Sequence, residues 1–231
     1  YKASSGERLV REDLCHEAIR LLTLLTDHPA TRGPRSFALL SLMLFNAARL
    51  PARTDDAGNL LRLHEQNRAD WDGVMIQRGI QCLARSAGGD TLDEYHLEAA
   101  IAACHSTASD AAATNWSRIL MLYNQLILLN GSPVVALNRA VAVARVQGPQ
   151  AGLEAIARTE NLAALESYHL VHAIRGTLAA ESGDHSGALA HFRLGEKLAV
   201  LPTERDFIRR RIAELDGQQS ATSERTSEES G

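Results

Sequence analysis

The sequence of 231 residues contains few of the residues that mark disulfide-bonded, metal-binding or membrane-spanning proteins. Its three cysteines, Cys15, Cys82 and Cys104, are too few and too scattered for a disulfide framework or a CxxC zinc site. Each lies among apolar residues of an expected helix, which favours small buried side chains. No apolar run reaches the length of about 18 residues that a membrane-spanning helix needs, so we expect no membrane segment.

The sequence also lacks an excess of basic residues. Lys and Arg number 24 and Asp and Glu 28, which gives a formal net charge of −4. The tail after Leu215 contributes −3 of this charge, so the rest of the chain, called the body here, is near −1. The charged residues of the tail are Asp216, Glu224, Arg225, Glu228 and Glu229. A body this close to neutral lacks the basic footprint of a stand-alone nucleic-acid binder.

The first residues show no signal for export. The sequence begins Tyr-Lys-Ala-Ser-Ser-Gly, without Met and without the basic-then-apolar leader of a secretory precursor. We therefore expect a cytoplasmic domain, either cut from a longer protein or matured.

Catalytic motifs are absent as well. The sequence contains no GxSxG, GxxxxGK[ST], GxGxxG, HExxH or EF-hand pattern. His169 and His172 lie three residues apart on one helical face, but no Cys or carboxylate signature completes a metal site around them. Arg209, Arg210 and Arg211 are interspersed among acids, which favours a solvated helix face. We expect no enzymatic activity, no cofactor and no metal.

What the sequence does contain is helical periodicity almost throughout. Leu14, Ala18, Leu21, Leu22 and Leu25 recur on one face of a helix. The segment 134–143 is rich in β-branched residues, but its length and alanine content favour a buried helix that begins at Ser132-Pro133. The pattern predicts an all-α fold, an array of about ten helices in hairpins, with no sheet beyond two short strands.

A spacing typical of the tetratricopeptide repeat (TPR), a helical hairpin of about 34 residues, occurs in the C-terminal third. Counted from His169, positions 8, 15, 20 and 24 are Gly176, Gly183, Ala188 and Phe192. Small residues at the first and third of these let two helices approach closely. We expect one single all-helical TPR-like domain over 1–215, with a possible subdivision into 1–110 and 111–215. The acidic tail over 216–231 has no apolar periodicity and is predicted to be disordered.

One long segment without helical periodicity runs over 51–70 and ends in a polar stretch with a tryptophan. Two interpretations remain open: the stretch is held on the helices internally, or it contacts a partner. Polar residues inside the apolar run 134–143 suggest a structural clamp between the two segments. The candidate residues for clamp or partner contacts include two aromatics of another expected helix, Trp116 and Tyr123. The full set is Glu65, Gln66, Arg68, Trp71, Asp72, Trp116, Tyr123, Asn138 and Arg139.

Several segments occur in an order that carries a resemblance to a known family. They are DLCHEAIRLLTLL, ALLSLMLFNAARLPAR, LHEQNRADWD, YHLEAAIAACH, TNW…LYNQL, SPVVALNRAVAVA and ERDFIRRRIAEL. Over 1–215 the chain resembles the C-terminal TPR-like extension of extracytoplasmic-function sigma factors of RNA polymerase. SPVVALNRAVAVA is the most specific of these segments.

The resemblance implies a regulatory domain for transcription initiation that contacts the N-terminal sigma regions and RNA polymerase. Small proteins of the DGPF/YCII type are further possible partners, whereas promoter DNA would be reached only through upstream sigma regions that this sequence lacks. No membrane partner is implied. Two alternatives stay open: a free-standing TPR-type adaptor that binds a peptide, and a small-molecule enzyme.

The charge balance generates a first prediction. This chain alone should bind promoter DNA weakly and without sequence preference, because a body near −1 neutralises few phosphates and the acidic tail repels them. Fluorescence anisotropy with labelled promoter and scrambled duplexes measures this. Sub-micromolar, sequence-selective binding at physiological salt would contradict it.

Overall fold

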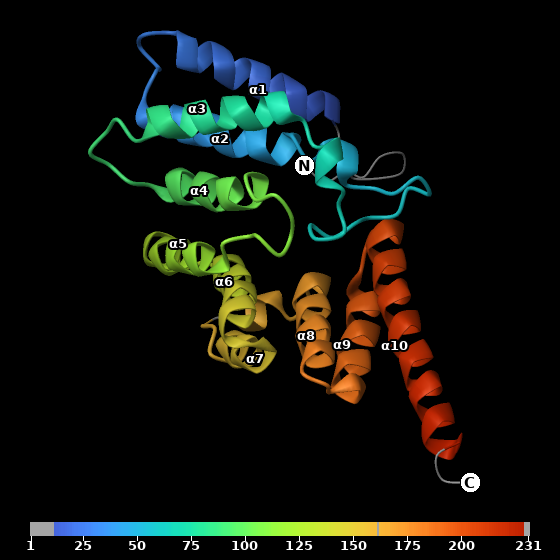
Figure 1. Ribbon diagram of the computed structural model, residues 1–231. Helices are drawn as coiled ribbons and strands as arrows, with labels where there is room; N and C mark the ends of the chain where they lie inside the picture. The colour runs from blue at the N-terminus through green and yellow to red at the C-terminus, as the bar shows by residue number, and fades with distance from the viewer. Residues whose placement is uncertain (1–11, 161, 229–231) are drawn as a thin grey trace. The chain divides into compact units, whose positions relative to one another are not determined.

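The computed structural model describes residues 12–160 and 162–228, and this part of the chain is all-helical (Figure 1). Its only β-type pairing is an isolated bridge between Thr54 and Leu60. The all-α prediction is therefore confirmed. The elements are α1 (Glu12–Asp27), α2 (Pro34–Ala47), η1 (Leu50–Ala52), η2 (Arg68–Asp70), α3 (Gly73–Ser86), α4 (Glu94–Ser106), α5 (Trp116–Leu129), α6 (Pro133–Gln147), α7 (Pro149–Ala157), η3 (Leu162–Leu165), α8 (His169–Glu181), α9 (His185–Leu198) and α10 (Pro202–Glu228).

The chain forms two compact units, Tyr1–Val135 and Ala136–Gly231. The boundary lies within the first turn of α6, further along the chain than the subdivision at 110 that we expected. A helix that crosses the boundary hides it from sequence patterns, because no break in periodicity marks it. The two units are described in turn.

In the first unit α2 is the central helix and packs against α1, α3 and α4 (Figure 1). Its contact with α3 is the tightest. A Cβ added at Gly79 of α3 would lie 2.9 Å from the Phe45 ring, and Ser41 donates a hydrogen bond to the Gly79 carbonyl oxygen at 2.8 Å. Ser41 and Phe45 are both fully buried. The glycine thus lets a large aromatic ring and a backbone carbonyl reach α2 together.

Helix α1 shows a different buried face from the one the sequence suggests. Ile19, Leu22 and Thr26 are buried, mostly against α2, whereas Leu14 and Leu21 are 45% and 48% exposed. The expected stripe and the buried face share only Leu22. The reason is that α1 is apolar over more than one side, so periodicity alone does not decide which side packs.

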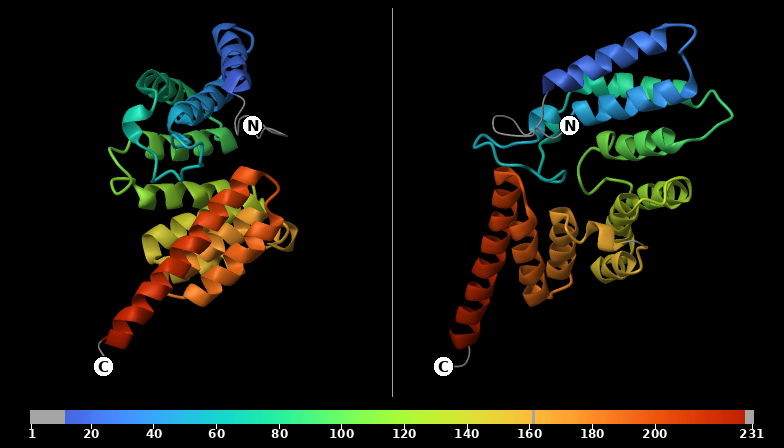
Figure 2. Two further views of the ribbon diagram at one scale, coloured as in Figure 1. Left: turned by 90° about the vertical axis from the view of Figure 1, so that its right-hand side faces the viewer. Right: turned by 180° about the vertical axis from the view of Figure 1, so that it is seen from behind.

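The second unit consists of α6 to α10. The β-branched segment is helical, as predicted, and the Ser132 hydroxyl accepts a hydrogen bond from the Val135 amide at its start. α8 and α9 form a hairpin, and α10 packs against α9 (Figure 2). Gly183 joins the hairpin with a φ of 88°, a conformation that glycine adopts without strain, and Asp184 then caps α9.

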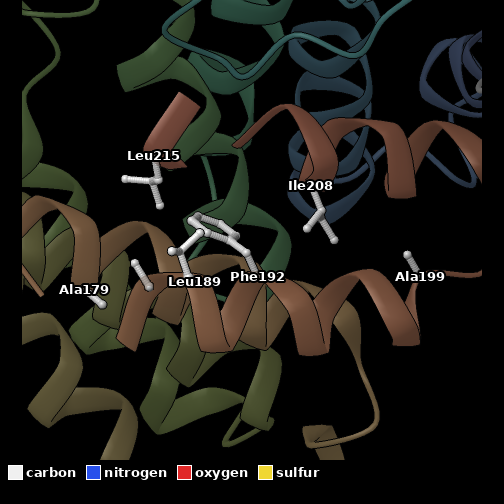
Figure 3. Close-up of a cluster of buried hydrophobic side chains, with 7 residues drawn as sticks. Ala179, Leu189, Phe192, Ala199, Ile208 and Leu215 are labelled. Carbon is white, nitrogen blue, oxygen red and sulfur yellow. The ribbon is translucent and has the colours of Figure 1, made fainter. Parts of the chain in front are cut away.

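The core of this hairpin contains the small and aromatic residues that the sequence spacing singled out. Ala188 and Phe192 are fully buried, and a Cβ at Gly176 would lie 3.0 Å from the Phe192 ring. Figure 3 shows Phe192 of α9 beside Leu189 of the same helix, on the side that faces Ile208 and Leu215 of α10. Gly176 therefore lies where the Phe192 ring of α9 packs directly on the backbone of α8.

Past Leu215 the backbone of α10 continues as a helix to Glu228, over most of the segment whose composition predicts disorder. This stretch lacks proline, and its Gln, Ser, Ala and Glu residues tolerate helical dihedral angles, so the helix can extend past Leu215. Residues 229–231 lie outside the described residues.

The close approach at Gly176 generates a prediction about stability. Gly176→Leu should lower the free energy of unfolding by about 1–3 kcal/mol, because the new side chain overpacks against Phe192. Urea denaturation measures the effect. Gly217→Leu on α10, where nothing lies within 4 Å of an added Cβ, is the matched control and should leave stability unchanged or raise it. Equal effects of the two substitutions would refute the close contact.

Candidate functional site

The long segment between α2 and α3, called here the 49–72 loop, is fixed at both ends. The Asp72 amide donates to the Ala48 carbonyl oxygen at 2.9 Å, which brings the end of the loop back to its start. The Asp72 carboxylate accepts from the Met75 amide and caps α3. Trp71, next to this cap, is only 7% exposed. The loop therefore leaves the helices and returns to the same place.

Arg68 connects this loop to the segment that joins α4 and α5. One guanidinium nitrogen donates to the backbone carbonyl oxygens of His105 and Ala108, and the other lies 3.4 Å from the Thr114 hydroxyl. The guanidinium also lies over the Trp71 ring, 4.6 Å from its centroid. Of the two interpretations of the loop, this geometry gives the internal one for Arg68 and Trp71.

Three further side chains, those of Arg49, His105 and Trp116, join Arg68 and Trp71 in what we call the arginine–tryptophan cluster. The Arg49 guanidinium donates to the Asn46 amide oxygen at 2.9 Å. The His105 ring packs edge-on against Trp116, with 5.2 Å between the centroids. The side chains of the cluster therefore come from the two ends of the 49–72 loop, the end of α4 and the start of α5.

Positive charge dominates the electrostatics of this cluster. Burial, with the charges of Arg53 and Arg68, lowers the pKa of Arg49 to about 10. Burial, with the charges of Arg49 and Arg68, lowers the pKa of His105 to about 4, so this imidazole is neutral at pH 7. In the described part of the chain, Arg49, Arg53 and Arg68 form no ion pair, and the acid whose charge acts on the pKa of Arg68 is the exposed Asp110.

Other residues that the sequence singled out stabilise the loop itself. Glu65 accepts from the Arg62 amide and pairs with its guanidinium at 2.5 Å. The Gln66 amide donates to the Leu61 carbonyl oxygen at 3.2 Å. Together with Asp72, these residues are used locally, within the loop or at its end.

The expected clamp extends into the second unit, where Asn138 is exposed and Arg139 is half-buried. Both carboxylates proposed as acceptors for Arg139, those of Glu65 and Asp72, have the local contacts given above. The clamp itself stays a prediction. Tyr123 on α5 is half-buried, and burial together with the charge of Glu98 raises its pKa to about 12.

The histidines of α8 make structural contacts within the second unit. His169 Nε2 lies 3.6 Å from a carboxylate oxygen of Glu204, and both side chains are buried. His172 Nε2 lies 2.9 Å from the Glu166 carbonyl oxygen. Among the residues described, no group of three potential metal ligands lies together.

The cysteines and the arginines of α10, which the sequence also singled out, have surroundings that are common for structural residues. The three cysteines are free and half-buried, and burial raises the pKa of Cys82 and Cys104. Arg209 pairs with Glu196 and Asp206 on exposed helix faces. No helix in the part of the chain that the structure describes is long and apolar enough to span a membrane.

Sequence reasoning missed Arg49 and His105. Arg49 is one of several arginines around the start of the loop, and nothing in its spacing indicates that it lies near Arg68. His105 drew attention only as a neighbour of Cys104, and its contact with Trp116 depends on the turn between α4 and α5. The sole available signal was the high arginine content of a segment next to a tryptophan.

Comparisons with known proteins leave the function open. Residues 1–87 match a family described as a family of unknown function (DUF6596). The chain is 35% identical over 226 residues to the uncharacterized protein R00370 of Rhizobium meliloti (strain 1021). This match covers 97% of the chain and 52% of that protein, so the chain spans about half the length of this curated relative. No solved structure matches the chain.

The cluster predicts how stability responds to pH. His105 binds a proton in the unfolded state below its ordinary pKa of 6.5, but in the folded state only near 4. The free energy of unfolding should therefore fall as the pH drops from 6.5 to 4, with a contribution from His105 of at most about 3 kcal/mol.

Chemical denaturation across this pH range measures the effect. His105→Phe, which keeps a ring against Trp116 but does not titrate, should reduce the loss on acidification. His16→Phe on the exposed side of α1 should retain it. An unchanged pH dependence in His105→Phe would show that His105 is not held neutral by the cluster.

Proposed function

We propose that the chain is the regulatory C-terminal domain of an RNA polymerase sigma factor and acts through protein contacts in transcription initiation. The observation that carries this proposal is the ordered run of segments over 1–215, above all SPVVALNRAVAVA, that resembles the TPR-like extension of these sigma factors. Its partners would be the N-terminal sigma regions and the polymerase, in the cytoplasm. The matched half of the longer Rhizobium relative leaves room for sigma regions in its other half.

The helical architecture is compatible with the TPR part of this proposal. In the hairpin of α8 and α9 the Phe192 ring packs on Gly176, and Ala188 and Phe192 are fully buried, which is compatible with a TPR unit. α10 would be the helix that caps the repeat.

Helix α1 offers a surface for the sigma regions. Leu14, Leu21, Leu24 and Leu25 are each between 45% and 55% exposed, although a leucine contributes most when it is buried. Leu14, Leu21 and Leu25 follow the spacing of one helix face. An apolar stripe of this kind is typical of a surface that receives a partner helix. We assign this face to the sigma regions because α1 is the first described helix of the segment 1–215 that resembles the extension.

Binding of the sigma regions, expressed separately from the same reading frame upstream, tests the proposal. The chain should bind them, and Leu21→Asp with Leu25→Asp should weaken binding at least tenfold, because two carboxylates enter an apolar contact. Isothermal titration calorimetry measures the affinity. Leu92→Asp, at a leucine that is 57% exposed outside α1, is the matched control and should bind like the wild type.

Absence of sigma regions in the upstream reading frame, or failure to bind both these regions and the core polymerase, would overturn the proposal. The second candidate, a free-standing TPR-type adaptor, would then be favoured by the α8–α9 hairpin. Such an adaptor would bind a peptide, whereas small proteins of the DGPF/YCII type are further partners to test under the sigma-factor proposal.

A further inference from the structure

The arginine–tryptophan cluster contains positive charge that the protein itself does not compensate. Arg49 and Arg68 are both half-buried, and the charges of Arg53 and Arg68 lower the pKa of Arg49. The hydrogen bond from the Asp72 amide to the Ala48 carbonyl oxygen, at 2.9 Å, brings the backbone next to Arg49 together with the backbone next to Trp71. Buried or half-buried charges in proteins are ordinarily paired, because removal from water is costly without a partner. Among the described residues, the acid whose charge acts on the pKa of Arg68 is Asp110, and its carboxylate already accepts from the Ala113 amide.

Hydrogen-bond donors in the cluster are also left over. A guanidinium carries five N–H donors, and Arg49 uses one of them, on the exposed Asn46 side chain. The Nε1–H donor of Trp71 has no partner among the described residues, although this residue is 93% buried, as its 7% exposure means. Buried donors without a partner are rare and call for an explanation.

Arg68 is held in place by groups that do not neutralise it. Its partners are the carbonyl oxygens of His105 and Ala108, the Thr114 hydroxyl and the Trp71 ring. These contacts orient the guanidinium but do not compensate its positive charge, because none of the partners is charged. A pre-oriented arginine beside a second arginine with free donors is an arrangement that suits an oxyanion.

We propose that Arg49, Arg68 and Trp71 form a binding site for a small oxyanion, a phosphate or a carboxylate group. The oxyanion supplies the missing negative charge and accepts hydrogen bonds from Arg49 and from the Trp71 indole. It joins the start of the 49–72 loop, through Arg49, to the end of the same loop, through Arg68, which also contacts the α4–α5 connection. This inference is independent of the sigma-factor proposal, since it depends only on contacts within the first unit.

In a site of this kind, Arg49 lowers the stability of the free protein but is necessary for binding the oxyanion. If Arg49 were a structural residue, its removal would destabilise the free protein. In a binding site, Arg49→Gln removes a charge that its neighbours repel, so the free protein should unfold at an equal or higher temperature. The same substitution should remove oxyanion binding.

The two tryptophans provide the measurement, because Trp71 and Trp116 are the only ones in the sequence. Sodium phosphate and sodium acetate are each titrated into ¹⁵N-labelled protein at constant ionic strength, and the indole N–H signals are followed by NMR. Trp71→Phe assigns the signals. We expect a saturable shift of the Trp71 signal with a Kd on the order of 1 mM or tighter. Saturation by phosphate alone or by acetate as well distinguishes the two ligand classes.

Arg49→Gln should weaken this binding at least tenfold without lowering the melting temperature in the absence of anions. Arg78→Gln, at an exposed arginine of α3, is the matched control and should bind like the wild type. The proposal is overturned by any of three results: no saturable shift with either anion, equal binding by Arg49→Gln and wild type, or a lower melting temperature of anion-free Arg49→Gln.

Discussion

The first unit depends on the contact between α2 and α3 at Gly79. The Phe45 ring occupies the space that a side chain at position 79 would fill, and the Ser41 hydroxyl bonds to the Gly79 carbonyl oxygen. α2 and α3 are the two helices that the 49–72 loop joins, so this contact sets the distance between the loop's ends. A larger residue at position 79 would displace Phe45 or separate the helices. The hydrogen bond from Asp72 to Ala48, and with it the place of Trp71, relies on that spacing.

The two units differ in how their buried and half-buried charges are paired. In the second unit several buried or half-buried titratable groups have an opposite charge beside them, as in the pairs His169–Glu204 and Arg175–Glu166. In the cluster of the first unit, arginines lie together and the histidine between them is neutral. The former pattern stabilises a fold, whereas the latter reduces stability unless something else binds. This contrast is why we look for ligand chemistry in the first unit and for packing in the second.

The sequence was sufficient for the features that depend on local spacing. Helical periodicity gave the all-α class, the helix after Ser132, and the hairpin around Gly176 and Ala188, because these follow from residues a few turns apart. It failed where the outcome depends on long-range packing. The buried face of α1 is chosen by α2, and the unit boundary lies inside a continuous helix. The cluster combines Arg49 with His105, which are separated by two helices, and no periodicity connects them.

The packing of α1 has a consequence for the dynamics of the chain. α1 packs mainly on α2, through few buried side chains, while α2 is held on further sides by α3 and α4. Local opening of α1 would therefore expose little of the core, and its backbone amides should exchange with solvent through an opening that leaves α2 folded. A helix with low local stability and an exposed leucine stripe can be reoriented at little cost. Helix α1, which we propose contacts the sigma regions, is thus also the helix that can move without unfolding the rest of the first unit.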